Sequence, residues 1–419
     1  MFDLDKWQEI WQTITRNKTR SIFTAFGVFW GILMLTILLG TGNGLENGMM
    51  SNLEGFATNS CFFYAGRTSE NYKSFKKGRE WNMHSEDLKV ILANVPEIQY
   101  LSPMVFGGSS ENNTVRGDKS GTFGVRGCYP DYNHIEEQKI IYGRYINDID
   151  IQDNRKVCFI GKNVYDALFK PGEIPLGQII RSNGIYYKII GVGSGVSNVQ
   201  IGGKSDDMVI LPFTTMQKTY NHGNVIDFMA TTAKPGFEVS YIEEQIKNIL
   251  KTRNNISPTD ESAVGSFNIS EQFKIFSYLF LGIRILIWIV GLGTLFAGAV
   301  GVSNIMLVSV RERTKEIGLK RAIGAKPKDI IIQILEESLV LTVIAGFIGL
   351  SLGVGILAIF NNIIDNLPPG NDIFLKNIMI KFDVALLASF VLIIIGLLAG
   401  MLPAWRAMQI KPIEALNEE

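Results

Sequence analysis

Four long stretches of the chain contain no ionisable residue, and they constrain its fold more than any other feature. Each is 22 to 27 residues long. A helix needs about 20 apolar residues to cross the ~30 Å hydrocarbon core of a bilayer. A buried helix of a soluble protein would explain one such stretch, but four in a chain of 419 residues predict a membrane protein with four transmembrane α-helices. The stretches are Ser21–Leu45, Ile285–Val310, Ser338–Ile364 and Val384–Trp405.

The first stretch has an alternative interpretation as a secretory signal peptide. Its apolar run is longer than the ~7–15 residues of a signal peptide, and no cleavage site of small residues follows it. We therefore interpret it as a retained membrane anchor. Because none of the four stretches carries an ionisable side chain, a proton- or sodium-driven transporter and a hydrophilic pore are both disfavoured.

Lysine and arginine residues near the span ends predict which side of the membrane each segment occupies. Seven lie between spans two and three, from Arg311 to Lys328, four precede span one, and two follow span four. The linker between spans three and four has only Lys376 and Lys381, beside three aspartates. Basic residues are retained on the cytoplasmic side. Both termini and the segment 311–337 are therefore expected in the cytoplasm, and the long segment after span one outside it.

These observations divide the chain into nine segments. They are a cytoplasmic amphipathic helix (1–20), the first span (21–45), a large extracytoplasmic α+β domain (46–267), a helical stalk with the second span (268–310), a cytoplasmic loop (311–337), the third span (338–364), an outer loop (365–383), the fourth span (384–405) and a cytoplasmic tail (406–419).

The first twenty residues place four large apolar side chains at spacings of three and four. Two are tryptophans, and basic residues follow, which favours a helix in the membrane interface over one packed on a soluble partner. The four are Leu4, Trp7, Trp11 and Ile14.

The outer segment mixes strand and helix patterns. Residues 178–192 alternate around Asn183-Gly184, as in a β-hairpin. Residues 156–169 predict a strand running into a short helix, and residues 238–253 an amphipathic helix. The class is therefore α+β, with two subdomains expected.

Little in the sequence indicates catalysis or a metal. The three histidines have no metal-ligand spacing, and no nucleophile or acid pair stands out. The formal net charge of zero gives no case for nucleic acid. The three cysteines permit one disulfide, although free thiols are at least as favoured.

Small residues recur at every fourth position in the spans, which lets helices approach closely in lipid. Their repetition predicts a tight bundle or a dimer face. The residues are Gly27 and Gly31 in span one, Gly293, Ala297 and Gly301 in span two, Ala345, Gly349 and Gly353 in span three, and Gly396 and Gly400 in span four.

Five apolar residues before and at the start of span two are spaced four, three, four and three apart, as in a coiled-coil seam. They predict that span two continues outwards as a stalk packed on another helix, with Arg284 at the membrane surface. The seam consists of Ile269, Phe273, Phe276, Phe280 and Ile283.

The segment between spans two and three, RERTKEIGLKRAIGAKPKDI, is rich in strong helix formers. Gly324 predicts the end of a short helix and Pro327 the approach to the next one. The residues alone fit a docking helix and a solvated loop equally well.

Three parts of the chain resemble the FtsX-like permease family, ABC transporters of the MacB type. Residues 303–353 resemble its signature around span two, and PAWRAMQIKPIEAL (403–416) its closing motif. The stretches GVRGCYPDYNHIEEQKIIYGRYIND and KVCFIGKNVYDALF resemble its outer domain. The resemblance implies a bacterial inner-membrane protein with four spans, a periplasmic domain, a stalk, and a homodimer or pseudo-symmetric heterodimer of permeases.

The resemblance also implies that the loop after span two contacts an ABC ATPase. The residues that fall on this coupling segment are Arg311, Glu312, Arg313, Glu316, Ile317, Gly318, Arg321, Gly324 and Ala325. A Walker A motif needs G-x-x-x-x-G-K-[ST], and the nearest approach, NVQIGGKS, has Asn198 in place of the first glycine. We therefore expect ATP and Mg²⁺ on a separate ATPase polypeptide, no cofactor on this chain, and no catalytic activity of its own.

The function implied by the resemblance is mechanotransmission, in which ATP-driven motion reaches the periplasmic domain through the spans. Efflux of a small molecule or peptide, with a periplasmic adaptor and an outer-membrane channel, is the favoured use. Release of lipoproteins and a non-transport role in signalling or in regulating cell-wall hydrolases are the alternatives.

The stalk seam yields a first prediction. A carboxylate in a packed apolar seam costs several kcal/mol of desolvation unless it is paired, so Phe276→Asp should uncouple ATP turnover from transport. Transport and ATP hydrolysis are measured on the same membranes. Normal transport by the variant would exclude a packed stalk.

Overall fold

The computed structural model describes residues 18–108, 111, 113–197, 199–366 and 375–410. The helix predicted over 1–20 lies outside the described residues except at its end, and most of the predicted tail lies outside them too. Two compact units are present, one formed by the chain up to Met49 and from Tyr278 onwards, the other by Met50–Ser277.

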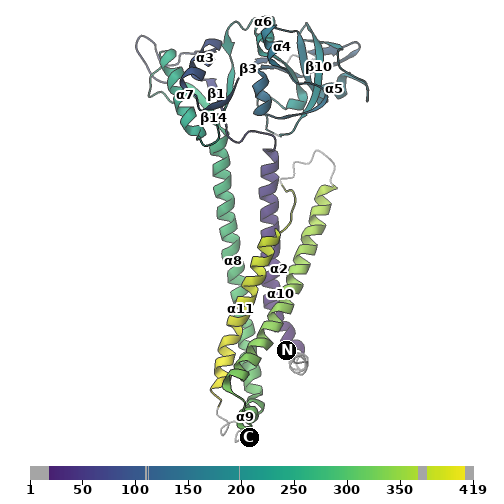
Figure 1. The fold of residues 1–419 in the computed structure, drawn as a ribbon, viewed down its shortest axis with the longest axis vertical. Coiled ribbons are helices and arrows are strands. Elements are labelled where there is room, and N and C mark those ends of the chain that lie inside the picture. The colour runs from purple at the N-terminus through teal and green to yellow at the C-terminus, as the bar shows by residue number, and fades with distance from the viewer. Residues whose placement is uncertain (1–17, 109–110, 112, 198, 367–374, 411–419) are drawn as a thin grey trace. The chain divides into compact units, whose positions relative to one another are not determined.

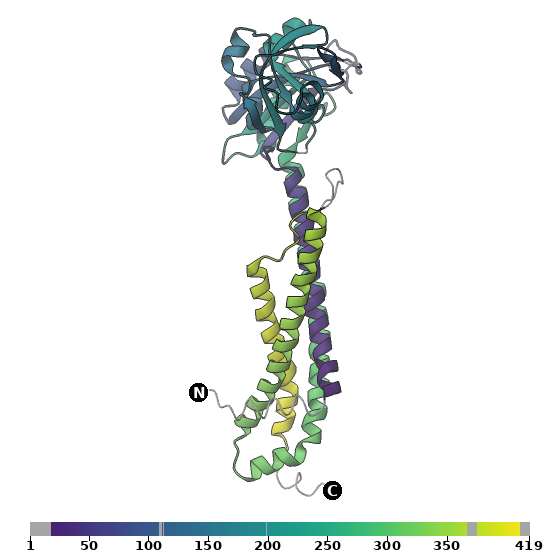
Figure 2. The ribbon, with the colours of Figure 1, turned by 90° about the vertical axis from the view of Figure 1, so that its right-hand side faces the viewer.

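Four helices are long and apolar enough to cross a membrane, which confirms the predicted spans. They lie side by side in the first unit (Figures 1 and 2). A short helix, α9 (Thr314–Ala322), joins the second to the third. The four are α2 (Lys18–Asn52), α8 (Ile269–Glu312), α10 (Pro327–Asp365) and α11 (Phe382–Met408).

Helices α2 and α8 run antiparallel and touch at the backbone. A Cβ atom at Gly27 would lie 3.2 Å from the Cα of Gly298, and one at Gly298 would lie 2.9 Å from the carbonyl carbon of Gly27. The next turn places Gly31 against Leu295, where a Cβ would be 3.1 Å from a leucine methyl carbon. Such contacts leave little room for a side chain, so glycine lets the two helices approach this closely.

The third and fourth spans also make close helix contacts at glycine residues. A Cβ at Gly349 of α10 would lie 2.7 Å from the carbonyl oxygen of Phe29 in α2. Close contacts also occur at Gly353, against Thr36 of α2, and at Gly396 and Gly400 of α11, against Thr342 and Ser338 of α10. The hydroxyl of Ser338 donates a hydrogen bond of 3.0 Å to the carbonyl oxygen of Gly396. Ala345 is buried.

The small residues predicted in span two make no such contact within the described residues. Gly293, Ala297 and Gly301 are exposed, and a Cβ at either glycine would meet no atom within 4 Å. Helix α8 approaches α2 through Gly291 and Gly298 instead. Gly293 lies two residues after Gly291, and two residues correspond to a rotation of about 200° around the helix axis. The predicted stripe therefore faces away from α2.

The predicted stalk and second span form one continuous helix, because α8 begins at Ile269. In the seam, Ile269 and Phe280 are buried and the other three residues are half-buried. On the opposite side, Tyr278 is 72% exposed. The seam is therefore the covered face of the helix. Arg284 pairs with Glu46 of α2 at 2.6 Å.

The second unit contains a twelve-stranded sheet in which β14, β1, β13, β3, β6, β11, β8, β10, β9, β4 and β5 follow in order and β7 also pairs with β10. The predicted α+β class is confirmed. The strands are β1 (Ser60–Ala65), β3 (Ile98–Gly107), β4 (Thr114–Arg116), β5 (Lys119–Gly121), β6 (Gly124–Cys128), β7 (Gln138–Gly143), β8 (Val157–Gly161), β9 (Ile179–Ser182), β10 (Ile185–Gly195), β11 (Met208–Pro212), β13 (Phe228–Ala233) and β14 (Val264–Asn268), and β2 (Met83–His84) pairs separately with β12 (Val225–Ile226).

Short helices accompany this sheet (Figure 1). Hydrogen bonds link all twelve strands into one sheet, with β7 branching off at β10, so the two subdomains that we expected are not separated by a break in the sheet. The helices are α3 (Ser85–Asn94), α4 (Asp148–Gln152), α5 (Lys162–Leu168), α6 (Phe213–Thr219) and α7 (Val239–Arg253), with 3₁₀ turns η1 (Pro130–His134) and η2 (Ser205–Asp207).

The local predictions for this unit are confirmed. Asn183 and Gly184 both have positive φ, at 47° and 83°, and form the two-residue turn between β9 and β10. Strand β8 leads directly into α5, and α7 occupies the predicted helical stretch. All three cysteines are buried free thiols.

Alternate side chains of the central strands enter two different cores. Phe63 and Val105 belong to one cluster of buried apolar residues, whereas their neighbours Phe62 and Met104 belong to another. Successive residues of a strand point to opposite faces, so both faces of the sheet are covered. This explains the nearly continuous apolar runs in these strands.

A buried aspartate ties two loops of this unit together. Asp260 is 1% exposed, and its carboxylate accepts hydrogen bonds from the backbone N–H groups of Ser69, Glu70, Ser262 and Ala263 and from the Ser69 hydroxyl. Burial alone would raise the pKa of Asp260, but these donors outweigh it and lower the pKa below its ordinary value.

Because the pKa of Asp260 is lower in the folded state, its contribution to stability is complete above the unfolded pKa of ~3.9 and is lost as the pH falls through the folded value. Asp260→Asn should lower the free energy of unfolding at neutral pH by about 2 kcal/mol and remove this acid dependence. Calorimetry between about pH 3 and 7 tests it. Asp153→Asn, which changes an exposed carboxylate, is the control, and equal effects of the two variants would contradict the prediction.

Candidate functional site around helix α9

Helix α9 has the end signals expected of a short helix. Glu316 lies in its first turn, and Lys320 and Arg321 lie in its last, which complements the helix dipole. Gly324 has a φ of +109°, a conformation that favours glycine and ends the helix. The sequence left a docking helix and a solvated loop open; the structure has a helix, and it ends just before Gly324.

The connection between spans two and three is more helical than predicted. We expected a loop over 311–337, but α10 begins at Pro327, so residues 327–337 form its first turns. Proline is well suited to the first position of a helix, and no glycine or second proline follows it before Ser338. The charged residues of this stretch consequently belong to a rigid helix.

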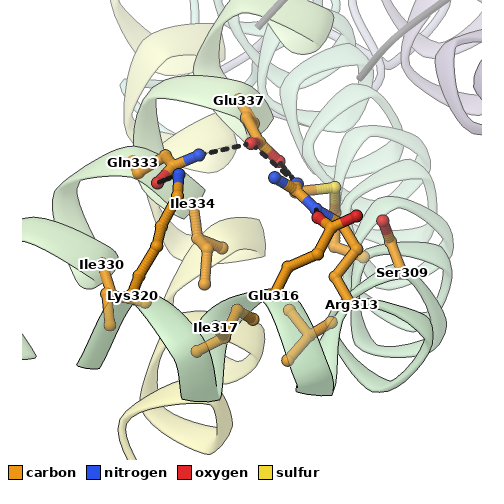
Figure 3. A pocket seen from close by; sticks show the side chains of 11 residues that line it. Ser309, Arg313, Glu316, Ile317, Lys320, Ile330, Gln333, Ile334 and Glu337 are labelled. Carbon is orange, nitrogen blue, oxygen red and sulfur yellow. Dashed lines mark hydrogen bonds and ion pairs between the residues drawn. The ribbon is translucent and has the colours of Figure 1, made fainter. Parts of the chain in front are cut away.

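An ion pair fastens the start of α9 to α10 (Figure 3). Nη1 of Arg313 lies 3.0 and 3.2 Å from the two carboxylate oxygens of Glu337, which is 3% exposed. Nε of Arg313 donates to Glu316 at 3.1 Å, and Gln333 donates to Glu337 at 3.4 Å. Burial opposes the charge of Arg313, but Glu337, with help from Glu316, raises the pKa of its guanidinium above the ordinary value.

Three further hydrogen bonds fasten the end of α9. Nη1 of Arg321 donates to the carbonyl oxygens of Met408 and Ile410, at 2.9 and 2.5 Å, at the end of α11. Lys320 donates to Gln333 of α10 at 3.4 Å. Helix α9 is thus held by polar contacts to both α10 and α11.

The space between α8, α9 and α10 is a small cavity of about 20 Å³ (Figure 3). Arg313, Glu316, Lys320, Gln333 and Glu337 contribute its polar lining. This volume suits about one water molecule, so the arrangement is a joint between helices and not a ligand pocket. Among the described residues no group of three metal-ligating side chains occurs.

The predicted coupling residues separate into an inner and an outer set. Ile317 and Gly318 are buried, and Arg313, Arg321 and Ala325 are half-buried. The outer set is exposed and consists of Arg311, Glu312, Glu316 and Gly324.

Five participants of this site were not among the coupling residues predicted from the sequence. Glu337 and Gln333 fall in the segment that we expected to be a loop, although a carboxylate directly before an apolar span is itself a signal, because it needs a partner there. Lys320 was not selected either, and neither were Ile323 and Leu319, which form the outward apolar face of α9. Their exposed fractions are 79% and 51%.

The chain matches two protein-family models. Residues 21–249, more than half of the chain, match the MacB-like periplasmic core domain, and residues 288–412 match the FtsX-like permease C-terminal.

Curated relatives align over nearly the whole chain. The macrolide export ATP-binding/permease protein MacB of Bdellovibrio bacteriovorus is 27% identical over 97% of this chain. The pyoverdine export ATP-binding/permease protein PvdT of Pseudomonas putida is 25% identical over 99% of it. The chain spans 61% and 60% of the length of these two relatives.

Among solved structures, the periplasmic region of MacB from Actinobacillus actinomycetemcomitans is similar, with 19% identity and a TM-score of 0.43. The similarity covers 55% of this chain and 97% of that one.

The ion pair gives a prediction about α9. Glu337→Ala leaves the half-buried charge of Arg313 without its closest partner, which should lower stability by about 2 kcal/mol and accelerate amide exchange in α9. Glu336→Ala on the same helix should change stability by less than about 0.5 kcal/mol. Thermal unfolding and hydrogen exchange of the purified protein measure both. Slow exchange in α9 of Glu337→Ala would show that the pair does not hold this helix.

Proposed function

Because this chain belongs to the family of MacB-type, FtsX-like ABC transporter permeases, we propose that it transmits the motion of an ATPase across the membrane by mechanotransmission. The ATPase is supplied by a separate polypeptide, which binds ATP and Mg²⁺. When its nucleotide-binding domains close, they push α9, and the spans carry the displacement to the outer unit.

The outward face of α9 is the observation that carries this proposal. Leu319 and Ile323 lie one turn apart and are exposed. Lys315 lies one turn before Leu319, and Glu312, at the end of α8, is exposed too. An apolar pair rimmed by charges is typical of a protein contact site. We propose that these residues, with Arg311, Glu316 and Gly324, dock into the ATPase.

The inner set of coupling residues has a different role in this proposal. Arg313 and Arg321 do not need to touch the ATPase, because they connect α9 to α10 and α11. A force on α9 would reach α10 through Glu337, and α8 through the short junction at Arg313. The neutral, closely packed spans suit a lever better than a polar pathway.

The relatives' names supply the proposed substrate class. One is a macrolide exporter and another a pyoverdine exporter, so we propose export of a bulky small molecule or peptide. The protein would work as a dimer in the bacterial inner membrane, with both termini cytoplasmic and the outer unit periplasmic. A periplasmic adaptor and an outer-membrane channel would complete the route.

The docking face is tested by charge reversal at Glu312 and Glu316 and, separately, by Leu319→Asp with Ile323→Asp. Each pair of substitutions should reduce the amount of ATPase that copurifies with the tagged protein by about tenfold or more. Copurification in mild detergent with quantitative mass spectrometry provides the measurement.

Lys381→Glu is the control, because it reverses an exposed charge just before α11, at the other end of the bundle. Its ATPase recovery should equal that of the unmodified protein. Unchanged recovery with both docking variants would disprove the proposed docking face.

A further inference from the structure

The outer end of α2 is unusually rich in glycine. Residues 40–48 read GTGNGLENG and contain four glycines. Glycine is the least favourable helix residue after proline, because it loses most backbone freedom on folding. Even so, α2 continues without interruption to Asn52. Contacts from outside the helix must therefore help to keep this stretch helical.

A non-helical segment before α11, Lys376–Met379, supplies such contacts. The side-chain amide of Asn47 donates to the carbonyl oxygen of Asn377 at 3.2 Å, and that of Asn43 donates to Met379 at 3.3 Å. In the reverse direction, the backbone N–H of Lys376 donates to the carbonyl oxygen of Gly44 at 3.1 Å. Three hydrogen bonds thus join this segment to one turn of α2.

An apolar side chain of the same segment occupies the space that the glycines leave. Ile378 is 2% exposed, and a Cβ at Gly44 would lie 2.7 Å from its Cγ1. Its backbone N–H donates to the side-chain oxygen of Asn361 in α10 at 3.0 Å. Leu357 of α10 fills the corresponding space at Gly40, where a Cβ would lie 2.2 Å from a leucine methyl carbon.

Helix α8 has no comparable weak stretch beside this region. Between Ile269 and Val290 it contains one glycine, Gly282. The start of α8 is also fixed, because Asn268 accepts from the N–H of Glu271 and donates to Glu243 of α7 at 2.7 Å. The two helices that lead to the outer unit therefore differ in stiffness.

We propose that Gly40–Gly48 is a hinge in α2. Lys376–Met379 is the latch, the segment whose contacts keep this stretch of α2 straight. With the latch seated, α2 is straight and moves together with α10. When the latch leaves, α2 bends at the glycines while α8 stays rigid. All the latch contacts are neutral hydrogen bonds or apolar packing, which can break and re-form without separating charges.

The latch is a property of this chain alone, so its test does not depend on the proposed ATPase contact. We would measure amide hydrogen exchange of the full-length protein in lipid nanodiscs. Asn43→Ala with Asn47→Ala removes two latch bonds but places a better helix former at both positions. Faster exchange over 40–48, by roughly tenfold, is therefore expected only if the latch holds the hinge.

Asn362→Ala is the matched control, because its side chain accepts a hydrogen bond from Asn366 of the same helix. It should leave exchange over 40–48 unchanged. Gly42→Ala, whose Cβ would meet only the end of the Ile287 side chain at 3.0 Å, should restore slow exchange in the double variant by stiffening the hinge. Unchanged exchange in the double variant, or an equal increase along all of α2 and α8, would overturn the proposal.

A crosslink provides an independent measurement. A Cβ at Gly44 would lie 3.3 Å from the Cβ of Ile378, close to the 3.5–4.5 Å of a disulfide. The native thiols at Cys61, Cys128 and Cys158 are buried and should not interfere. Mild oxidation of Gly44→Cys with Ile378→Cys should form the bond and slow exchange at the hinge. Failure to crosslink would show that the latch is not seated there and would also overturn the proposal.

Discussion

Close backbone contact between α2 and α8 is the constraint on which the helical bundle depends. At Gly27 and Gly298 the two helices touch without an intervening side chain. In lipid there is no hydrophobic drive to bring apolar helices together, so close packing must supply the attraction. Helix α10 uses Gly349 and Gly353 to join the pair, and α11 uses Gly396 and Gly400 to join α10.

Polar contacts occur at the two ends of this bundle and have different strengths. At one end, the charged pair of Arg313 and Glu337 is largely buried, and breaking it would leave an uncompensated charge. At the other, Glu46 pairs with Arg284, and Asn43 and Asn47 make neutral bonds to the main-chain carbonyls of Met379 and Asn377. In the proposed function, the pair of Arg313 and Glu337 would act as a permanent joint that transmits force from α9. The neutral bonds of Asn43 and Asn47 suit a contact that opens and closes.

The spans, the hairpin turn and the helix ends of this chain were predictable because they rest on composition and short-range spacing. Four uncharged stretches were enough to predict the spans, and Asn183-Gly184 was enough to predict the turn of a hairpin. Gly324 and Pro327 marked the ends of helices correctly, because each acts on the backbone of its own residue. By contrast, spacing alone did not say which neighbour the small-residue stripe of α8 meets, and within the described residues Gly293 and Gly301 face no other helix of this chain.

The sequence by itself determined that the protein has four spans, an α+β domain after the first span and a basic segment, rich in helix formers, between spans two and three. The length of an apolar stretch and the residues that start or end a helix are read from adjacent positions in the sequence. Contacts with distant parts of the chain hardly alter what they predict. Only the tertiary structure decided which residues of α9 face inwards, that Glu337 pairs with Arg313, and that Ile378 packs on Gly44. These pairs lie 24 and 334 residues apart (337 − 313 and 378 − 44), and they meet only because the packed helices bring them together.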